Sequence, residues 1–381
     1  MAEASDWKKY GNILCVRPDN FGDVLMTTPA LRALKQAVPG RRITLLTSRA
    51  GAGIAPFIPE IDDCIVFDVP WCKHPASVAA VPGLERTIAD IRSRGFEAAI
   101  IFNVFSQNPL PSAMLCYMAG IPAVAGYCRE NPYHLISYWL VDEEPLSSIR
   151  HEVVRQLDLA RSLGASTQDE SLSLTIPSGT LDKLPAKLES LGVDPQQPRL
   201  ILHAGASEAK RQFPAEIYAE AARILADELD YRILLTGLEA ERGVAERIAG
   251  WVGGKAQSLA GMLSLEELIA LIKSSALLVS NNTGPAHIAA AVKTPVVVLY
   301  ALTNPQHTPW KVRHRVLPFE VPGGLQSRNA LIRYANERCF RQPTDKVGPS
   351  EIVDAVKDLL AERNRPSRYE PGLMNAILRS A

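Results

Sequence analysis

Short apolar runs alternate with amphipathic segments along most of this 381-residue chain, and this alternation limits the possible folds more than any other feature. The apolar runs have the length of β-strands and are apolar on both faces, and several are separated by segments with a helical period. Strands that are buried on both faces and joined by helices are typical of a parallel sheet. The sequence therefore predicts an α/β fold.

The expected elements fall into two successive α/β sets. Strands are expected at residues 13–16, 43–47, 64–67, 98–102 and 123–126, and then at 200–203, 231–236, 276–280 and 295–300. Helices are expected at residues 28–38, 84–94, 110–119 and 149–163, and then at 214–229, 239–249, 265–273, 285–292 and 349–363.

The alternation is interrupted once, by a polar segment that contains Pro185, Pro195 and Pro198. Such a segment is typical of an interdomain connection, and domains of about 150 residues would give this chain two. We therefore expect two Rossmann-like domains with parallel sheets facing a central cleft. Their bounds are predicted as residues 1–180, a linker over 181–198, residues 199–348, and a C-terminal helix and tail over 349–381.

The composition excludes several classes of protein. Lys and Arg together number 41 and Asp and Glu number 41, and this zero net charge argues against a nucleic-acid partner. No apolar run approaches the ~18 residues that a spanning helix needs, and the first ten residues lack the apolar segment of a secretory signal. The six cysteines are scattered without a Cys-x-x-Cys spacing, which favours free thiols in a reducing cytoplasm.

The first candidate site is a glycine-containing loop after the first strand, where residues 17–25 read RPDNFGDVL. Such a loop lies at the carboxyl edge of a parallel sheet, where α/β proteins bind ligands. Asp23 has two interpretations: a helix N-cap that accepts backbone N–H bonds, or a general base. Arg17 and Asn20 are either surface residues or part of an anionic acceptor site.

The second candidate site follows the first strand of the second half, where residues 203–211 read HAGASEAKR. The small residues Gly205 and Ala206 let the backbone approach a ligand closely. The adjacent cations Lys210 and Arg211 can meet phosphate oxygens. The alternative interpretation is an ordinary loop with solvated charges.

The third candidate site is the most informative, and its residues 280–287 read SNNTGPAH. Pro285 fits the first turn of a helix that Asn282 or Thr283 can cap, so the backbone N–H groups at the helix start form an anion site. His287 lies one turn into this helix, where its imidazole can reach the same anion. A helix start of this kind, together with Lys210, suits a diphosphate.

Other nucleotide-binding motifs are absent from the sequence. A Gly-x-Gly pair at residues 51–53 lacks the third glycine of a dinucleotide fingerprint, whose position falls on Pro56, and no G-x-x-x-x-G-K-[ST] occurs. No Asp-x-Asp occurs either, so the usual carboxylate pair for a metal–nucleotide sugar complex is missing.

In this order, the three loops resemble glycosyltransferase family nine, whose best-known members are the lipopolysaccharide heptosyltransferases. Residues 21–23 (FGD) are similar to the family's L-G-D loop, residues 27–34 to its T-x-P-A-L-R-x-L helix, and residues 203–214 to its H-P-G-A-S…K-R-W-P segment. Residues 259–305 resemble its L-A-G…S-N-D-T-G-P-x-H…T-N-P block. The resemblance runs from about residue 13 to residue 309.

This resemblance implies a GT-B fold and an inverting transfer without a metal or a resident cofactor. The implied donor is a nucleotide sugar, ADP-heptose, and the acceptor is a glycan or a lipid-linked molecule of the lipopolysaccharide-core type. By position, Asp23 would be the general base that deprotonates the acceptor hydroxyl. A lipid acceptor would imply peripheral contact with the inner face of the cytoplasmic membrane.

The resemblance also implies how the donor is held. Lys210 would bind its diphosphate with help from Thr283, Gly284 and His287. Glu239 matches a position that binds the ribose. Leu263 falls where the family packs an apolar side chain on the base.

The chain departs from the family pattern where Asn282 replaces an Asp, Ala204 replaces a Pro, and Gln212-Phe213 replaces a Trp. Asn282 removes a negative charge near the donor but still forms hydrogen bonds. This departure keeps open a second alternative, a GT-B transferase with another nucleotide sugar or a small natural-product acceptor. A third is a catalytically silent nucleotide-binding subunit, against which the retention of Asp23, Lys210 and His287 argues.

Overall fold

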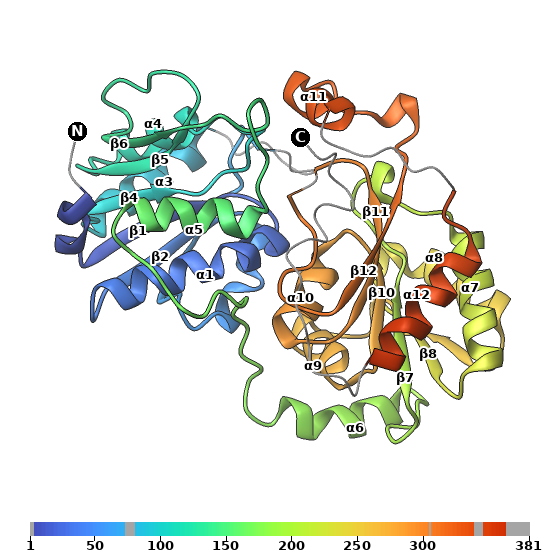
Figure 1. Ribbon diagram of the computed structural model, residues 1–381. Coiled ribbons are helices and arrows are strands. Elements are labelled where there is room, and N and C mark those ends of the chain that lie inside the picture. Colours follow the sequence, from blue (N-terminus) through green and yellow to red (C-terminus); the bar gives the residue numbers. More distant parts are fainter. Residues whose placement is uncertain (1–3, 73–80, 305, 339–345, 363–381) are drawn as a thin grey trace. The chain divides into compact units, whose positions relative to one another are not determined.

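The structure is a computed structural model that describes residues 4–72, 81–304, 306–338 and 346–362 (Figure 1). The chain divides into two compact units, Met1–Thr175 and Ile176–Ala381. The tail predicted after the last helix, residues 364–381, lies outside the described residues. The segment predicted as a linker, residues 181–198, overlaps helix α6 (Thr180–Ser190), which contains Pro185.

The first unit is built on one parallel sheet of six strands in the order β3-β2-β1-β4-β5-β6. Its strands are β1 (Asn12–Arg17), β2 (Arg42–Thr47), β3 (Asp63–Val66), β4 (Ala98–Ile101), β5 (Val124–Cys128) and β6 (Tyr138–Val141). Its helices are α1 (Phe21–Ala37), α2 (Arg49–Ala52), α3 (Val81–Ser93), α4 (Leu110–Met118) and α5 (Glu152–Ser162), with 3₁₀ turns at Ala4–Lys9 and Ala55–Phe57.

Alternate residues of β1, a central strand of this sheet, face opposite sides of the sheet. Leu14 and Val16 pack in a core with residues of α3 and α4, such as Ile91 and Cys116. Helices α1 and α5 contact one another and lie on the other face (Figure 1). Strand β1 pairs with β2 on one side and β4 on the other, so that Ile13 lies opposite both Ile43 and Ala98. The loop after β1 therefore lies where the strand order reverses, the usual ligand site of an open α/β sheet.

The second unit repeats this plan with the strand order β12-β11-β10-β7-β8-β9, also parallel. Its strands are β7 (Arg199–His203), β8 (Arg232–Leu235), β9 (Ala256–Ser258), β10 (Leu277–Asn281), β11 (Val296–Ala301) and β12 (His314–Phe319). Its further helices are α7 (Ala215–Glu228), α8 (Arg242–Val252), α9 (Leu265–Ser274), α10 (Gly284–Val292), α11 (Ala330–Arg338) and α12 (Pro349–Ala361). Its 3₁₀ turns are η3 (Ala209–Arg211), η4 (Glu239–Glu241) and η5 (Gly323–Leu325).

Two layers of helices cover this second sheet. Helices α7, α8 and α12 share one core with the strands, in which Tyr218, Ile248 and Val356 are fully buried. Helix α9 contacts α10 and α6. Strand β7 pairs with β8 and β10, so this sheet too reverses its strand order at its first strand, and the loops after β7 and β10 lie next to each other.

The predicted α/β architecture is confirmed, and the strands that the sequence did not predict lie at sheet edges. Strands β6, β9 and β12 are each the last strand of their sheet. Strand β9 carries no apolar run, because it reads AQS and all of its residues are half-buried. Helix α1 begins at Phe21, earlier than the predicted residue 28, because Asn20 has the extended backbone of an N-cap.

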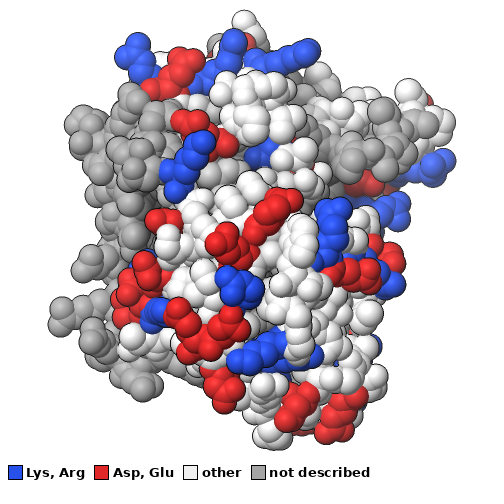
Figure 2. Space-filling view, turned by 90° about the vertical axis from the view of Figure 1, so that its right-hand side faces the viewer, with Lys and Arg blue, Asp and Glu red and all other residues white. Residues whose placement is uncertain are grey.

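The surface carries charges of both signs. On the face shown in Figure 2, Lys and Arg side chains are interspersed with Asp and Glu side chains. Among the described residues, no helix combines the length and the apolar character needed to cross a membrane.

Candidate functional site

The first part of the site is the loop between β1 and α1. Strand β1 ends at Arg17, helix α1 begins at Phe21, and Asp23 lies in the first turn of the helix with its side chain 18% exposed. A carboxylate in this position is stabilised by the positive end of the helix dipole. Asn20, a predicted acceptor residue, is exposed and caps the helix through its backbone carbonyl, to which Asp23 N donates at 3.0 Å.

Arg17 contacts three carboxylates, one through each nitrogen of its guanidinium. Its Nη2 donates to Asp23 Oδ1 at 3.3 Å, its Nε lies 3.1 Å from Asp19 Oδ2, and its Nη1 lies 2.8 Å from Glu152 Oε1. The Arg17 side chain has no exposed surface at all. The structure therefore gives Arg17 the contacts of a residue that positions Asp23, in place of the surface position expected for binding an acceptor.

Burial governs the ionisation of these carboxylates. It raises the pKa of Asp19 to about 6, against the opposing attraction of Arg17 and a hydrogen bond of 2.6 Å from Gln107 Nε2. Burial also raises the pKa of Glu152, although Arg17 and Arg155 both favour its charged form. Buried charges are tolerated only where partners of opposite charge and hydrogen bonds compensate them.

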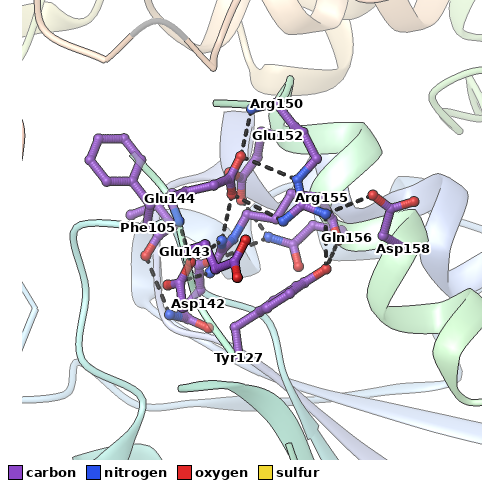
Figure 3. Close-up of polar contacts among 12 residues, drawn as sticks. Phe105, Tyr127, Asp142, Glu143, Glu144, Arg150, Glu152, Arg155, Gln156 and Asp158 are labelled. Carbon is purple, nitrogen blue, oxygen red and sulfur yellow. Dashed lines mark hydrogen bonds and ion pairs between the residues drawn. The ribbon is translucent and has the colours of Figure 1, made fainter. Parts of the chain in front are cut away.

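A second buried arginine adjoins this group (Figure 3). Arg155 Nη1 lies 2.8 Å from Asp142 Oδ1 and 2.6 Å from Glu144 Oε2, and its guanidinium stacks 4.1 Å from the centre of the Tyr127 ring. Arg155 shares helix α5 with Glu152, whose Oε1 accepts a hydrogen bond of 2.5 Å from Gln156 Nε2. Helix α5 thus forms ion pairs in two directions: Arg155 binds Asp142 after the edge strand β6, and Glu152 binds Arg17 beside the loop of Asp23.

In the second unit, the loop after β7 carries the two predicted cations. Lys210 Nζ lies 2.8 Å from Glu208 Oε2, and Arg211 Nη2 lies 3.6 Å from Glu208 Oε1. Arg211 Nη1 also donates to the backbone oxygen of Asn282 at 3.4 Å. The structure therefore brings the loops after β7 and β10 together, although 71 residues separate Arg211 from Asn282.

Asn281 fixes the contact between these two loops. Its Nδ2 donates to the backbone oxygen of Ala204 at 2.8 Å, and its Oδ1 accepts from the Tyr218 hydroxyl at 3.1 Å. All of these groups are buried. The backbone that leads to Gly205 and Ala206 is thereby held beside the start of α10.

The start of α10 is formed as the sequence predicts. Thr283 is the N-cap residue, Pro285 lies in the first turn, and His287 is buried one turn into the helix. Asn282 is 6% exposed, and its Oδ1 accepts from the backbone N–H of Ala301 at 3.3 Å. Starts of α-helices can bind phosphate through their backbone N–H groups, so the predicted anion site falls on Thr283 and Gly284 at the start of α10.

Glu239 and the loop of Leu263 lie next to each other at the ends of β8 and β9. A β-carbon on Gly261 would overlap Glu239 Oε2, so the Glu239 carboxylate lies directly against this loop. Arg242 Nη2 binds the same carboxylate oxygen at 2.5 Å. Leu263 is half-buried. These two predicted donor residues thus belong to adjoining loops.

Several residues of these clusters carry no recognisable signal in the sequence. Asp19, Gln107, Glu152 and Arg155 were not singled out, because Gln107 and the α5 residues come from distant segments without a motif of their own. Glu241 was also missed: its Oε2 accepts from Leu238 N at 2.7 Å, and its carboxylate lies against Gly205. The only sequence signal for Glu241 is its position as an acidic residue shortly after the Thr236-Gly237 turn.

The part of the chain that the structure describes contains no group of three or more His, Cys, Asp or Glu side chains placed to hold a metal ion. The acidic groups that do cluster, those of Asp19, Asp23 and Glu152, surround the guanidinium of Arg17.

Solved structures of similar fold include one of a family 9 glycosyl transferase from Veillonella parvula, with a TM-score of 0.73 and 20% identity over 93% of this chain and 98% of that one. A structure described as Escherichia coli ADP-heptose lps heptosyltransferase II has a TM-score of 0.68 and 21% identity, and covers 92% of this chain and 99% of that one. The two-unit architecture is therefore that of the GT-B fold.

Sequence relatives agree with this fold. The chain is 33% identical to the "Lipopolysaccharide core heptosyltransferase OpsX" of Haemophilus influenzae, over 77% of this chain and 80% of the relative. It is 23% identical to the "Lipopolysaccharide heptosyltransferase 2" of Salmonella typhimurium, over 92% and 99% respectively. The model of the family "Glycosyltransferase family 9 (heptosyltransferase)" matches residues 86–326. This chain belongs to that family and is a glycosyltransferase.

Proposed function

We propose that this enzyme transfers a heptose from ADP-heptose to a hydroxyl of a lipopolysaccharide-core type acceptor, with inversion and without a metal. The observation that carries this proposal is the Asp23 carboxylate, held by Arg17 at the carboxyl end of β1 in a chain of the heptosyltransferase family. The names of the relatives, which describe lipopolysaccharide heptosyltransferases, support the same donor sugar and acceptor class.

In the proposed reaction, Asp23 accepts the proton of the acceptor hydroxyl. The hydroxyl oxygen forms a bond to the anomeric carbon of the heptose while the bond from that carbon to the diphosphate oxygen breaks. The electron pair of the broken bond leaves with ADP, and the single displacement inverts the anomeric configuration. General-base assistance of this kind contributes about 10²–10⁴ in rate. Asn20, exposed at the same loop, remains our candidate for an acceptor contact.

The second unit is proposed to bind the donor and to stabilise the departing diphosphate. Negative charge grows on the diphosphate in the transition state, and cations and helix-end N–H groups that meet it there lower the barrier. Losing one such group costs roughly 10²–10³ in rate. The proposed donor-binding residues are Gly205, Ala206, Lys210, Arg211, Glu239, Leu263, Asn282, Thr283, Gly284 and His287.

A mass-resolved assay with ADP-heptose and a panel of core acceptors tests the proposed function. We expect a product heavier by one heptose, with an inverted anomeric configuration by NMR and with turnover that persists in EDTA. Asp23→Ala should abolish turnover and leave ADP affinity nearly unchanged by calorimetry. An equal loss of turnover and ADP binding would mean that Asp23 is structural.

Asn282 favours a second candidate, a GT-B transferase with another nucleotide sugar or a small acceptor. Where the family pattern has an aspartate, this chain presents an amide, which offers N–H donors in place of an anionic oxygen. Calorimetry with ADP and UDP separates the two candidates. Tighter binding of UDP than of ADP would favour the second.

The proposed acceptor class also bears on where the enzyme acts. A lipid-linked acceptor lies in a membrane, so we propose a cytoplasmic enzyme with peripheral contact at the inner face of the cytoplasmic membrane. Sedimentation with vesicles that contain the acceptor lipid tests this contact. Sedimentation equal to that with vesicles lacking the acceptor would contradict it.

A further inference from the structure

Glu152 is the one carboxylate of the Arg17 cluster that lies on a different helix from Asp23 and is completely buried. We infer that Glu152 is a positioning residue for Asp23: by binding the far side of Arg17, it limits the hold of that guanidinium on Asp23 and keeps the Asp23 carboxylate basic. This inference rests on the proposed role of Asp23 as the general base.

The geometry shows how Arg17 is divided among its partners. The contact of 2.8 Å between Nη1 and Glu152 is shorter than the bond of 3.3 Å between Nη2 and Asp23. Arg17 therefore meets Asp23 through one nitrogen and one oxygen, whereas an unconstrained arginine can bind a carboxylate through two parallel hydrogen bonds. A paired arginine typically lowers the pKa of an aspartate by about 1–3. A weaker contact therefore leaves the carboxylate a better base.

Glu152 is also held from within its own helix, at the same carboxylate oxygen that contacts Arg17. Gln156, one turn further along α5, donates to Glu152 Oε1 at 2.5 Å and also to the backbone oxygen of Asn103 at 3.3 Å. Arg155 adds an attractive charge to the Glu152 carboxylate. Glu152 is thus held by Arg17 and Gln156, and Figure 3 shows its side chain beside Gln156 and Arg155.

Charge gives a second reason for the same effect. Ionisable groups that interact with Asp23 include Arg17, Asp19, Glu152 and Cys72. The Cys72 thiol stays neutral because burial raises its pKa to about 12. The negative charges of Asp19 and Glu152 favour the protonated form of Asp23, whereas Arg17 favours the charged form. Removing the charge of Glu152 therefore makes Asp23 less basic directly and also by releasing Arg17 toward it.

The decisive variant is Glu152→Gln, which keeps the shape of the side chain and removes its charge. We expect kcat at neutral pH to fall about tenfold, the acidic limb of the kcat–pH profile to move to lower pH by about one unit, and KM for ADP-heptose to stay unchanged. The neighbouring Asp19, whose pKa is about 6, would shift in the same direction. Glu152→Asp keeps the charge and should leave the acidic limb in place.

The matched control is Glu144→Gln, which removes an equally buried carboxylate from Arg155 without touching Arg17. We expect it to lower the melting temperature while the acidic limb of kcat stays in place. If Glu152→Gln does not fold, Gln156→Leu provides a second test. It keeps both charges and frees Glu152 from one partner, so kcat should fall with ADP-heptose KM unchanged.

Two results separate failure of this inference from failure of the proposed function. An unmoved acidic limb in folded Glu152→Gln, or an unchanged kcat in Gln156→Leu, would overturn the positioning role while Asp23→Asn remained inactive. Full turnover by Asp23→Asn would instead overturn the assignment of the general base itself.

Discussion

Gly205 lies so close to Glu241 that a β-carbon on the glycine would overlap the Glu241 carboxylate. This contact joins the loop after β7 to the 3₁₀ turn η4 after β8, where Glu241 Oε2 accepts from Leu238 N at 2.7 Å. The small residue that the sequence predicts to lie against a ligand is therefore also required for packing between two loops of the proposed donor site.

Gly205→Ala should displace Glu241 and break its bond to Leu238. Because this bond caps η4, we expect the free energy of unfolding to fall by about 0.5–2 kcal/mol. We also expect ADP affinity to fall, as measured by calorimetry. The control is Gly243→Ala in α8, where a β-carbon meets no atom within 4 Å. Equal ADP affinities in the two variants would contradict the prediction.

Lys210→Ala should weaken donor binding because it removes a cation from the loop that faces the start of α10. We expect a rise in the Kd for ADP and a fall in kcat/KM of roughly 10²–10³. Arg223→Ala removes an exposed cation of α7 that pairs with Asp227, and it should change neither quantity. Unchanged ADP affinity in Lys210→Ala would contradict its phosphate-binding role.

His203 should make the fold sensitive to acid. Burial lowers the pKa of His203 to about 4 from 6.5, so the unfolded chain binds this proton more readily than the native one between those pH values. The free energy of unfolding should therefore fall as pH drops through this window, by about 2–3 kcal/mol between pH 7 and pH 4.5.

Denaturant unfolding of His203→Gln measures this effect as a difference from the parent protein. The comparison with the parent is needed because Asp19 acts in the opposite direction. Its pKa is raised from 3.8 to about 6, so its contribution to the free energy of unfolding falls as pH rises through that range. The variant should lose less stability than the parent between pH 7 and pH 4.5. His134→Gln, at an exposed histidine, should follow the parent. Identical losses in the His203 variant and the parent would refute the prediction.

Gly51→Ala should disturb the Asp19 loop. A β-carbon on Gly51 would overlap Thr47 Oγ1 and lie 2.7 Å from the backbone oxygen of Asp19, which also accepts from Ser48 Oγ at 2.7 Å. Because backbone must move, we expect a loss of stability of about 1–3 kcal/mol together with a lower kcat.

Gly250→Ala in α8 provides the control, because a β-carbon there meets nothing within 4 Å. An alanine in a helix is favoured over glycine, so this variant should be as stable as the parent or slightly more so. Thermal melts and kcat measured side by side decide between the two outcomes. A fully stable and active Gly51→Ala would show that the loop relaxes freely.

The sequence determined the α/β class, most strands and the three loops, because these depend on local pattern. Central strands such as β1 and β10 are apolar on both faces, and a motif such as Thr283-Gly284-Pro285 carries its own helix start. The edge strand β9 escaped prediction because it is only half-buried.

Only the tertiary structure decided which charges meet. Nothing in the sequence links Arg17 to Glu152, which lie on different elements, yet the packing of α1 against α5 brings Glu152 to within 2.8 Å of the Arg17 guanidinium. Burial then turned an expected surface arginine into an internal one that positions Asp23. Local pattern records the burial of apolar faces, whereas pairing of buried charges depends on distances between segments that are set only when the helices pack.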